Sequence, residues 1–210
     1  LLAQIHEGLT FVRGQRLLFP LFSCIAAAAF AGAGIQVLLP ILVLRTLGMS
    51  ATQLGVLLSA GALGGILGAI TRSAWITHLG IGRTIVVTSI IGVAVLAAQP
   101  AAVHAPAAAA AIIAVSGIVS SYFLTIYNVT QMSLRQEICP PDMLGRMNAI
   151  FRFAVWGVMP LGSFVAGIIA SWVGVEATMY IFTAASIAAG IAMGFTPAAR
   201  IRGASAADVS

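Results

Sequence analysis

Apolar stretches that are each long enough to form a whole helix alternate along the chain with short polar segments. Six long apolar stretches are separated by short segments that carry most of the charged residues. A membrane-spanning helix needs about 20 apolar residues, whereas a strand of a membrane barrel needs about ten. The pattern therefore predicts an all-α integral membrane protein with six transmembrane helices. The predicted spans are 17–44, 52–76, 84–99, 107–131, 148–172 and 176–196.

Composition places these stretches in lipid. Hydrophobic residues make up 60% of the chain and charged residues only 7%, with a mean hydropathy of +1.08. Since a soluble domain carries about 25% charged residues, this chain cannot cover a surface that faces water, and membrane lipid is its predicted partner. The net charge of +5 does not predict a nucleic-acid partner, because the arginines stand singly at the ends of spans.

The positive charges predict how the chain is threaded through the membrane. All ten basic residues are Arg, and six spans return both termini to the same side. Only Arg45 falls on the opposite side. Short loops rich in Arg stay in the cytoplasm during insertion, so both termini are predicted to be cytoplasmic. The arginines on or near that side are Arg13, Arg16, Arg72, Arg83, Arg135, Arg146, Arg152, Arg200 and Arg202.

The two ends of the chain predict short cytoplasmic segments beside the bundle. Apolar residues on one face of residues 1–16 indicate an amphipathic helix that lies in the membrane interface. The six-helix bundle is predicted over 17–198, and a small, polar tail over 199–210. The chain begins with Leu1 instead of Met, so we expect a fragment or one half of something longer.

A short sequence pattern in the first half of the chain recurs weakly in the second half. Each copy covers the second helix of a triplet, a tight turn and the start of the third helix. Because a triplet has an odd number of spans, the two turns fall on opposite membrane sides, as in the inverted repeats of secondary transporters. The pattern predicts three-plus-three inverted repeats, and coincidence among 22 glycines is the alternative. Leu67-Gly68, Leu79-Gly80 and Thr84 recur as Leu161-Gly162, Val173-Gly174 and Thr178.

The fourth predicted span carries a polar arc beside an apolar stripe. Polar side chains that face lipid are costly, so this arc should face protein or a water-filled cavity. Hydrogen bonding between helices is the alternative for the serines and threonines, whereas the amides of Asn128 and Gln131 need several partners and favour a cavity. The arc holds Ser116, Ser120, Ser121, Thr125, Tyr127, Asn128 and Gln131, and the stripe holds Val115, Val119, Tyr122, Ile126 and Val129.

The predicted substrate cavity joins this arc to two other spans. Gln36 lies in the first span and Trp156 in the fifth, each near Gly and Pro residues that permit bends. The third and sixth spans hold no amide or charge in their apolar middle, so we expect them to be outer, lipid-facing helices behind a wall of the other four. The predicted cavity residues are Gln36, Ser121, Thr125, Asn128, Gln131 and Trp156.

The second span contains two overlapping GxxxG patterns, Gly61/Gly65 and Gly64/Gly68. Small residues on one face let helix backbones approach closely, so tight packing is the main interpretation. A contact that slides or rocks during transport is the alternative. The preceding segment 50–53 reads Ser-Ala-Thr-Gln, which predicts a capping box at the start of this helix.

Charges of both signs crowd the loop between the fourth and fifth spans. One hypothesis is a network that holds a cytoplasmic gate, with Arg135 and Arg146 paired to Glu137 or Asp142. The other is that the arginines are ordinary positive-inside anchors. The gate residues of the first hypothesis are Arg135, Glu137, Asp142, Arg146 and Arg152.

Catalytic and metal-binding patterns are absent from the sequence. The three histidines lie in or beside loops, no Cys/His cluster occurs, and no carboxylate lies within a predicted span. We therefore predict no enzyme activity, no metal and no cofactor. No carboxylate of this chain is placed to relay protons at membrane depth.

The segment that joins the fourth and fifth spans has a distinctive order of residues. Arg135-Gln136 ends one helix, Pro141-Asp142 and Gly145-Arg146 follow, and Arg152, Trp156-Gly157 and Pro160-Leu161-Gly162 enter the next. This order resembles the major facilitator superfamily, in the branch of the enterobactin exporter and macrolide-efflux-like permeases. The segments 7–12 and 47–50 also resemble that branch. The usual loop signature of the superfamily is degenerate here, because its acidic position is not recognisable near Arg72.

The resemblance covers nearly the whole chain and corresponds to the C-terminal six spans of a twelve-span transporter. It implies proton-driven export of small amphipathic molecules, such as drugs or siderophores, by alternating access together with a missing N-terminal six-span half. It also implies the bacterial cytoplasmic (inner) membrane. The alternative is a non-transporting six-span membrane scaffold or a truncated fragment.

Overall fold

The structure is a computed structural model that describes residues 18–138 and 144–196. Within these ranges every regular element is a helix, and six helical segments are long and apolar enough to cross a membrane. The prediction of an all-α protein with six spans is therefore confirmed. The predicted interfacial helix 1–16 and tail 199–210 lie outside the described residues. The six spans are Phe22–Thr46, Ala51–Leu79, Ile81–His104, Pro106–Leu134, Phe151–Val173 and Val175–Gly194.

The helices follow the turn signals of the sequence. Ser50 and Gln53 form the predicted capping box, in which Ser50 Oγ accepts from the Gln53 N–H and Gln53 Oε1 accepts from the Ser50 N–H. The elements are α2 (Leu18–Ile41), the π-helical turn η1 (Leu42–Thr46), α3 (Ala51–Leu79), α4 (Ile81–Ala94), η2 (Val95–Ala97), α5 (Ala98–Ala101), η3 (Ala102–His104), η4 (Pro106–Ala108), α6 (Ala109–Ile138), α7 (Leu144–Val173) and α8 (Val175–Gly194).

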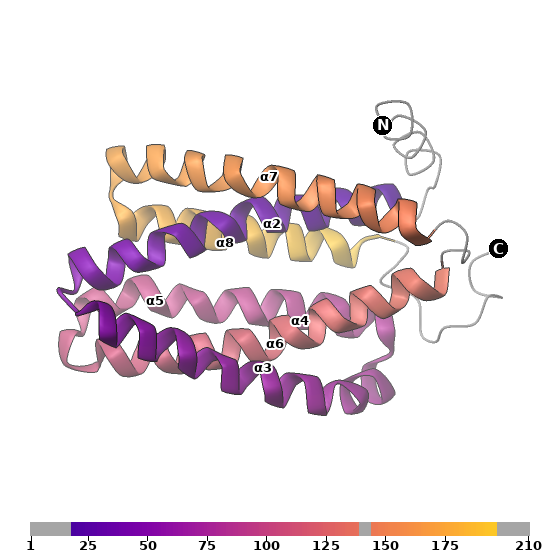
Figure 1. Ribbon diagram of the computed structural model, residues 1–210, viewed down its shortest axis with the longest axis horizontal. Helices are drawn as coiled ribbons and strands as arrows, with labels where there is room; N and C mark the ends of the chain where they lie inside the picture. The colour runs from indigo at the N-terminus through magenta and orange to yellow at the C-terminus, as the bar shows by residue number, and fades with distance from the viewer. Residues whose placement is uncertain (1–17, 139–143, 197–210) are drawn as a thin grey trace.

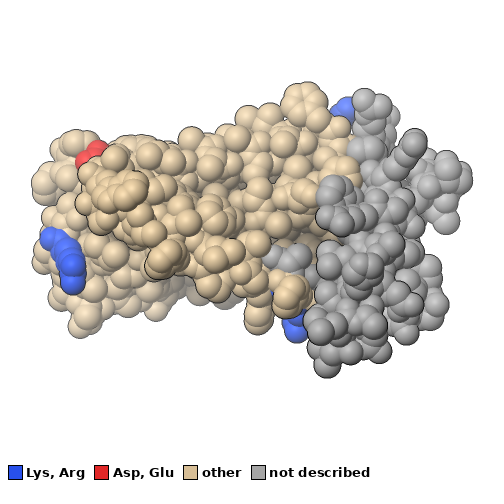
Figure 2. Space-filling view, turned by 90° about the horizontal axis from the view of Figure 1, so that it is seen from above, with Lys and Arg blue, Asp and Glu red and all other residues tan. Residues whose placement is uncertain are grey.

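The helices pack as two groups of three (Figure 1). One group holds α2, α7 and α8, the other holds α3, α4 and α6, and the two meet chiefly where α4 lies against α8. Helix α2 begins and α8 ends at the same end of the bundle, which we call the terminal end; the opposite one is the far end. On the face shown in Figure 2, charged side chains lie only towards the two ends, which leaves a broad uncharged middle that suits lipid.

The internal repeat is present in the backbone. Gly80 has φ 78° and ψ 165° between α3 and α4, and Gly174 has φ 89° and ψ 162° between α7 and α8. The Thr84 hydroxyl donates to the Gly80 carbonyl and the Thr178 hydroxyl to the Gly174 carbonyl, both at 2.7 Å. The two turns lie at opposite ends of the bundle (Figure 1). The two turns therefore share backbone angles, a hydrogen bond and opposite placement, as three-plus-three inverted repeats predict.

The four GxxxG glycines of α3 lie in its contact with α6. A Cβ on Gly64 would overlap the carbonyl of Ile118, and one on Gly68 would overlap that of Tyr122. In the second repeat, Gly162 meets the carbonyl of Phe30 in the same way. Glycine is needed at these positions because the backbone of the neighbouring helix occupies the space of a side chain.

The predicted apolar stripe of α6 is wrong at Tyr122. Its hydroxyl oxygen lies 2.9 Å from Thr71 Oγ1 and accepts from the indole N–H of Trp75, also at 2.9 Å. The ring of Tyr122 also meets that of Phe123 edge to face. Tyr122 thus joins α6 to α3 through polar contacts, because an aromatic hydroxyl at this depth needs partners.

Within this six-helix bundle the third and sixth spans are more buried than the second and fifth, and their lipid-facing position stays a prediction. Buried residues make up 44% of the apolar segment of the third span and 39% of that of the sixth, against 17% and 12% for the second and fifth. The buried faces carry small hydroxyl residues and glycines that permit close contact. The span that includes α4 and helix α8 form the middle of the bundle, and α3 and α7 form its more exposed flanks.

Candidate functional site

A cavity of about 850 Å³ lies in the half of the bundle nearer the terminal end. Its wall comes from α2, α4, η2, α6, α7 and α8, with no lining residue from α3 among the described residues. The volume is within the range of small-molecule sites. Of the spans predicted to form the wall, the first, fourth and fifth line this cavity, and the third and sixth line it as well.

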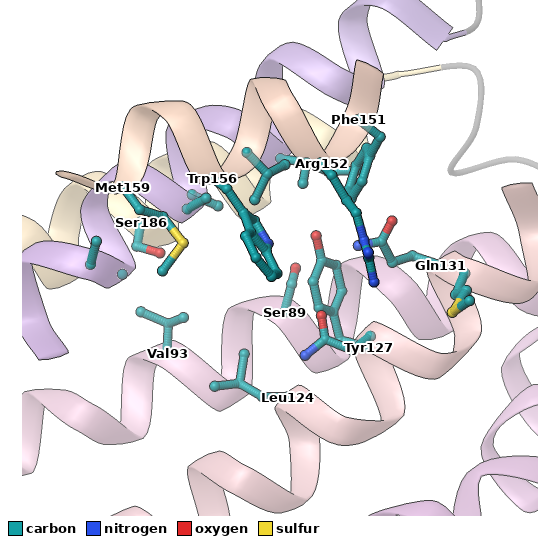
Figure 3. A pocket seen from close by; sticks show the side chains of 18 of the residues that line it. Ser89, Val93, Leu124, Tyr127, Gln131, Phe151, Arg152, Trp156, Met159 and Ser186 are labelled. Carbon is teal, nitrogen blue, oxygen red and sulfur yellow. The ribbon is translucent and has the colours of Figure 1, made fainter. Parts of the chain in front are cut away.

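Four of the six predicted cavity residues line this space. Gln36 comes from α2, Asn128 and Gln131 from α6, and Trp156 from α7. Figure 3 shows Gln131 and Trp156 on facing walls. The cavity therefore brings together side chains that lie more than 100 residues apart in the chain.

Ser121 and Thr125 do not line the cavity. A Cβ on Gly61 would lie 3.1 Å from Ser121 Oγ, and one on Gly65 would lie 3.3 Å from Thr125 Oγ1. Both side chains thus fill the space above the small residues of α3, as expected for hydroxyl groups between packed helices. The structure therefore places Ser121 and Thr125 in the contact between α6 and α3, as the alternative of packing between helices expects.

The cavity wall changes character along its length. Gln131 and Arg152 lie near the terminal end, whereas Val93, Leu124 and Met159 lie deeper (Figure 3). Asn148 lines the cavity from the start of α7. The deeper part holds few polar groups, with Gln36 among them. A ligand in this cavity therefore meets polar groups first and apolar walls beyond them.

Arg152 belongs to this wall. Its guanidinium carbon lies 5.5 Å from the ring centroid of Trp156, one helical turn further along α7, in a cation–π arrangement. The side chain is exposed to the cavity beside Tyr127 and Gln131 (Figure 3). The sequence placed Arg152 with the gate, whereas the structure places it within reach of a bound molecule.

The side chains of the other gate residues lie outside the described part of the structure. Arg135 and Glu137 fall in the last turns of α6 and Arg146 in the first turn of α7. Asp142 lies outside the described residues. The proposed charge network therefore stays a prediction.

Several cavity residues were missed by the sequence analysis. Ser89 of α4 and Ser186 of α8 are buried hydroxyl residues on the cavity wall, and Asn148 lines it from the start of α7. Tyr127 lay on the predicted polar arc but was not assigned to the cavity. The available signal for Ser89 and Ser186 was a row of small polar residues along one face of an otherwise apolar helix.

Two prolines weaken the helices at the cavity. Pro40 of α2 and Pro160 of α7 have no N–H, so the carbonyls of Gln36 and Trp156 lack the usual donor four residues later. Both of those residues line the cavity. The backbone at these two points can bend or accept a hydrogen bond from another group.

The far end of the bundle is filled by side chains. Apolar residues of α2, α7 and α8 form one buried cluster there, and residues from η1 to α6 form another. At the surface of this end, His104 Nε2 lies 2.7 Å from Glu176 Oε1. Among the described residues, no group of His, Cys, Asp and Glu side chains could hold a metal ion.

A comparison with protein families matches residues 21–208 to the Major Facilitator Superfamily. The chain belongs to the major facilitator superfamily. The comparisons with curated proteins and with solved structures gave no match. Members of the superfamily are transporters, so the cavity of this major facilitator chain is the candidate site for a transported molecule. Its six spans make it a multi-pass membrane protein.

Proposed function

We propose that this chain is the C-terminal six-span half of a secondary active transporter that exports small amphipathic molecules such as drugs or siderophores. The observation that carries the proposal is the cavity of about 850 Å³, whose apolar interior ends in a group of amide and aromatic side chains. Small-molecule sites typically combine apolar walls with a few convergent polar groups. Transport is favoured over a scaffold role because a scaffold has no need of such a site.

The proposed partner is the N-terminal six-span half of the same transporter. Large apolar side chains stand exposed along α3 and α7, including Ile70, Phe153 and Phe164, each exposed over more than half of its surface. Lipid and a second bundle are the two surroundings that suit them. The two bundles would rock against each other around the cavity, as in other transporters built from repeats.

Proton coupling requires a carboxylate from elsewhere in the transporter. Glu176 lies in the first turn of α8 at the far end, next to His104, and does not line the cavity. The described cavity residues contain no Asp or Glu. We propose that the other half supplies any proton-binding group at membrane depth.

Reconstitution in liposomes tests this function. The chain alone should not move an amphipathic dye, because half of the cavity wall is missing, and co-reconstitution with the N-terminal half should restore movement driven by a pH gradient. Trp156→Ala should then reduce transport strongly, whereas Trp172→Ala, whose ring is 80% exposed away from the cavity, should not. Transport by the chain alone would favour a homodimer. Full activity of Trp156→Ala would remove Trp156 from the transport site, and no transport by the two halves together would favour the scaffold.

We also propose that Arg135 and Arg146 hold a gate at the terminal end with Glu137 or Asp142. Arg146→Lys separates this role from a simple anchor, because Lys keeps the charge that sets topology but loses the planar fork that pairs with a carboxylate. The gate predicts impaired export at unchanged expression. Normal export by this variant leaves Arg146 as an anchor only.

A further inference from the structure

The charge balance of the cavity wall is one-sided. Arg152 is the only residue with a charged side chain among the described lining residues, and none of them is Asp or Glu. The described ion pairs also include no partner for it. Its guanidinium is exposed to the cavity, so an anion in this space can reach it.

The neighbours of Arg152 supply the remaining parts of a binding site. Trp156 presents its ring beside the guanidinium and is 65% exposed. Asn128 and Asn148 carry amide N–H groups on the α6 and α7 walls of the same space. A guanidinium fork pairs with carboxylate or phosphate oxygens through two parallel hydrogen bonds, and amides can donate to the same oxygens.

We infer that this cavity binds amphipathic organic anions, with a carboxylate or similar oxyanion at Arg152 and a flat apolar body against Trp156. The polarity gradient sets the orientation of the ligand. Its anionic group stays near the terminal end with Arg152, and its apolar body extends towards Val93, Leu124 and Met159. The inference narrows the cargo of the proposed function and rests on that function only for the transport of the ligand.

Binding of three matched probes tests the inference without any transport. The purified full chain is placed in nanodiscs of phosphatidylcholine and titrated with naphthylacetate, naphthylacetamide and naphthylethylamine, which share one aromatic body and differ in charge. Naphthylacetate should bind about tenfold more tightly than either other probe, which corresponds to about 1.4 kcal/mol. Equal or tighter binding of the cationic amine overturns the inference. Empty nanodiscs correct for partition into lipid.

Variants assign the preference to Arg152. Arg152→Gln should abolish the preference for naphthylacetate, while Arg83→Gln, which removes an exposed charge outside the cavity, should leave it unchanged. Arg152→Lys should keep a reduced preference, because the charge remains and the fork is lost. Trp156→Leu should weaken all three probes and keep their order. If folded Arg152→Gln still prefers naphthylacetate, Arg152 is not the anion-binding residue. If Arg152→Gln does not fold, an unchanged preference for naphthylacetate in Arg152→Lys leads to the same conclusion.

Internal neutralisation of Arg152 is the competing explanation. If Glu137 or Asp142 already pairs with the guanidinium, Glu137→Gln or Asp142→Asn should raise naphthylacetate affinity about tenfold, and that result overturns the inference. Unchanged affinity in both supports it. Export is measured separately from binding. If the chain binds naphthylacetate but the assembled transporter exports none of the probes, the proposed function is wrong and the anion site stands. If the transporter exports naphthylethylamine and Arg152→Gln does not change this export, the proposed function stands and the anion site is wrong.

Discussion

At the scale of single residues, helical periodicity predicted the polar face of α6 but not which of its residues face the cavity and which pack against α3. Ser121, Thr125, Asn128 and Gln131 all lie on one arc of α6, yet the first two meet the glycines of α3 and the last two line the cavity. The arc is wide enough to touch two neighbours, and the sequence does not contain the angle between helices. Side-chain chemistry supplied the division, since amides need more hydrogen-bond partners than hydroxyls.

Glycine positions give the sharpest test at this scale. Gly64→Ala should lower the free energy of unfolding by about 1–3 kcal/mol, because the new methyl group overlaps the Ile118 carbonyl and the helices must separate. Gly162→Ala should do the same against Phe30. Gly55→Ala, with open space around the new Cβ, is the matched control and should be neutral or slightly stabilising. Thermal unfolding in detergent measures all three, and equal melting of Gly64→Ala and Gly55→Ala contradicts the tight contact.

At the scale of elements, the six spans were predictable because a membrane imposes length and apolarity on every helix that crosses it. The sequence did not predict which spans lie in the middle of the bundle, because helices that face lipid and helices that face protein carry equally apolar side chains. The sequence did contain a weaker signal. Thr84, Thr88 and Ser89 of α4 and Thr178, Thr183 and Ser186 of α8 are small polar residues on buried faces.

The repeated turns provide a test of the inverted repeat itself. Gly80 and Gly174 combine positive φ with extended ψ, a region that only glycine adopts readily. Gly80→Ala and Gly174→Ala should each lower the free energy of unfolding by about 1–3 kcal/mol and by similar amounts. Gly117→Ala, inside α6 with open space around the new Cβ, is the control. Denaturant or thermal unfolding measures the effect, and a large loss at one turn with none at the other contradicts equivalent turns.

At the scale of the whole molecule, the two repeats generate a bundle with unlike ends. The far end is filled by apolar clusters and carries the pair of His104 and Glu176, while the cavity and its Arg152 lie towards the terminal end. The side of the membrane that each end faces follows from the arginines, which the sequence places almost entirely at the terminal end. Both termini are therefore predicted to be cytoplasmic, and the cavity of this half is then nearer the cytoplasm.

Cysteine labelling in intact cells decides this orientation. Cys24 and Cys139 are first replaced by Ser, and single cysteines are introduced at Ala107 on the far end and at His78 on the terminal end, both exposed. A thiol reagent that cannot cross the membrane should label Ala107→Cys from outside, whereas His78→Cys should react only after the cells are opened, because loops with Arg remain inside during insertion. Labelling of His78→Cys in intact cells contradicts the predicted threading. It also reverses the side from which an anion would first meet Arg152.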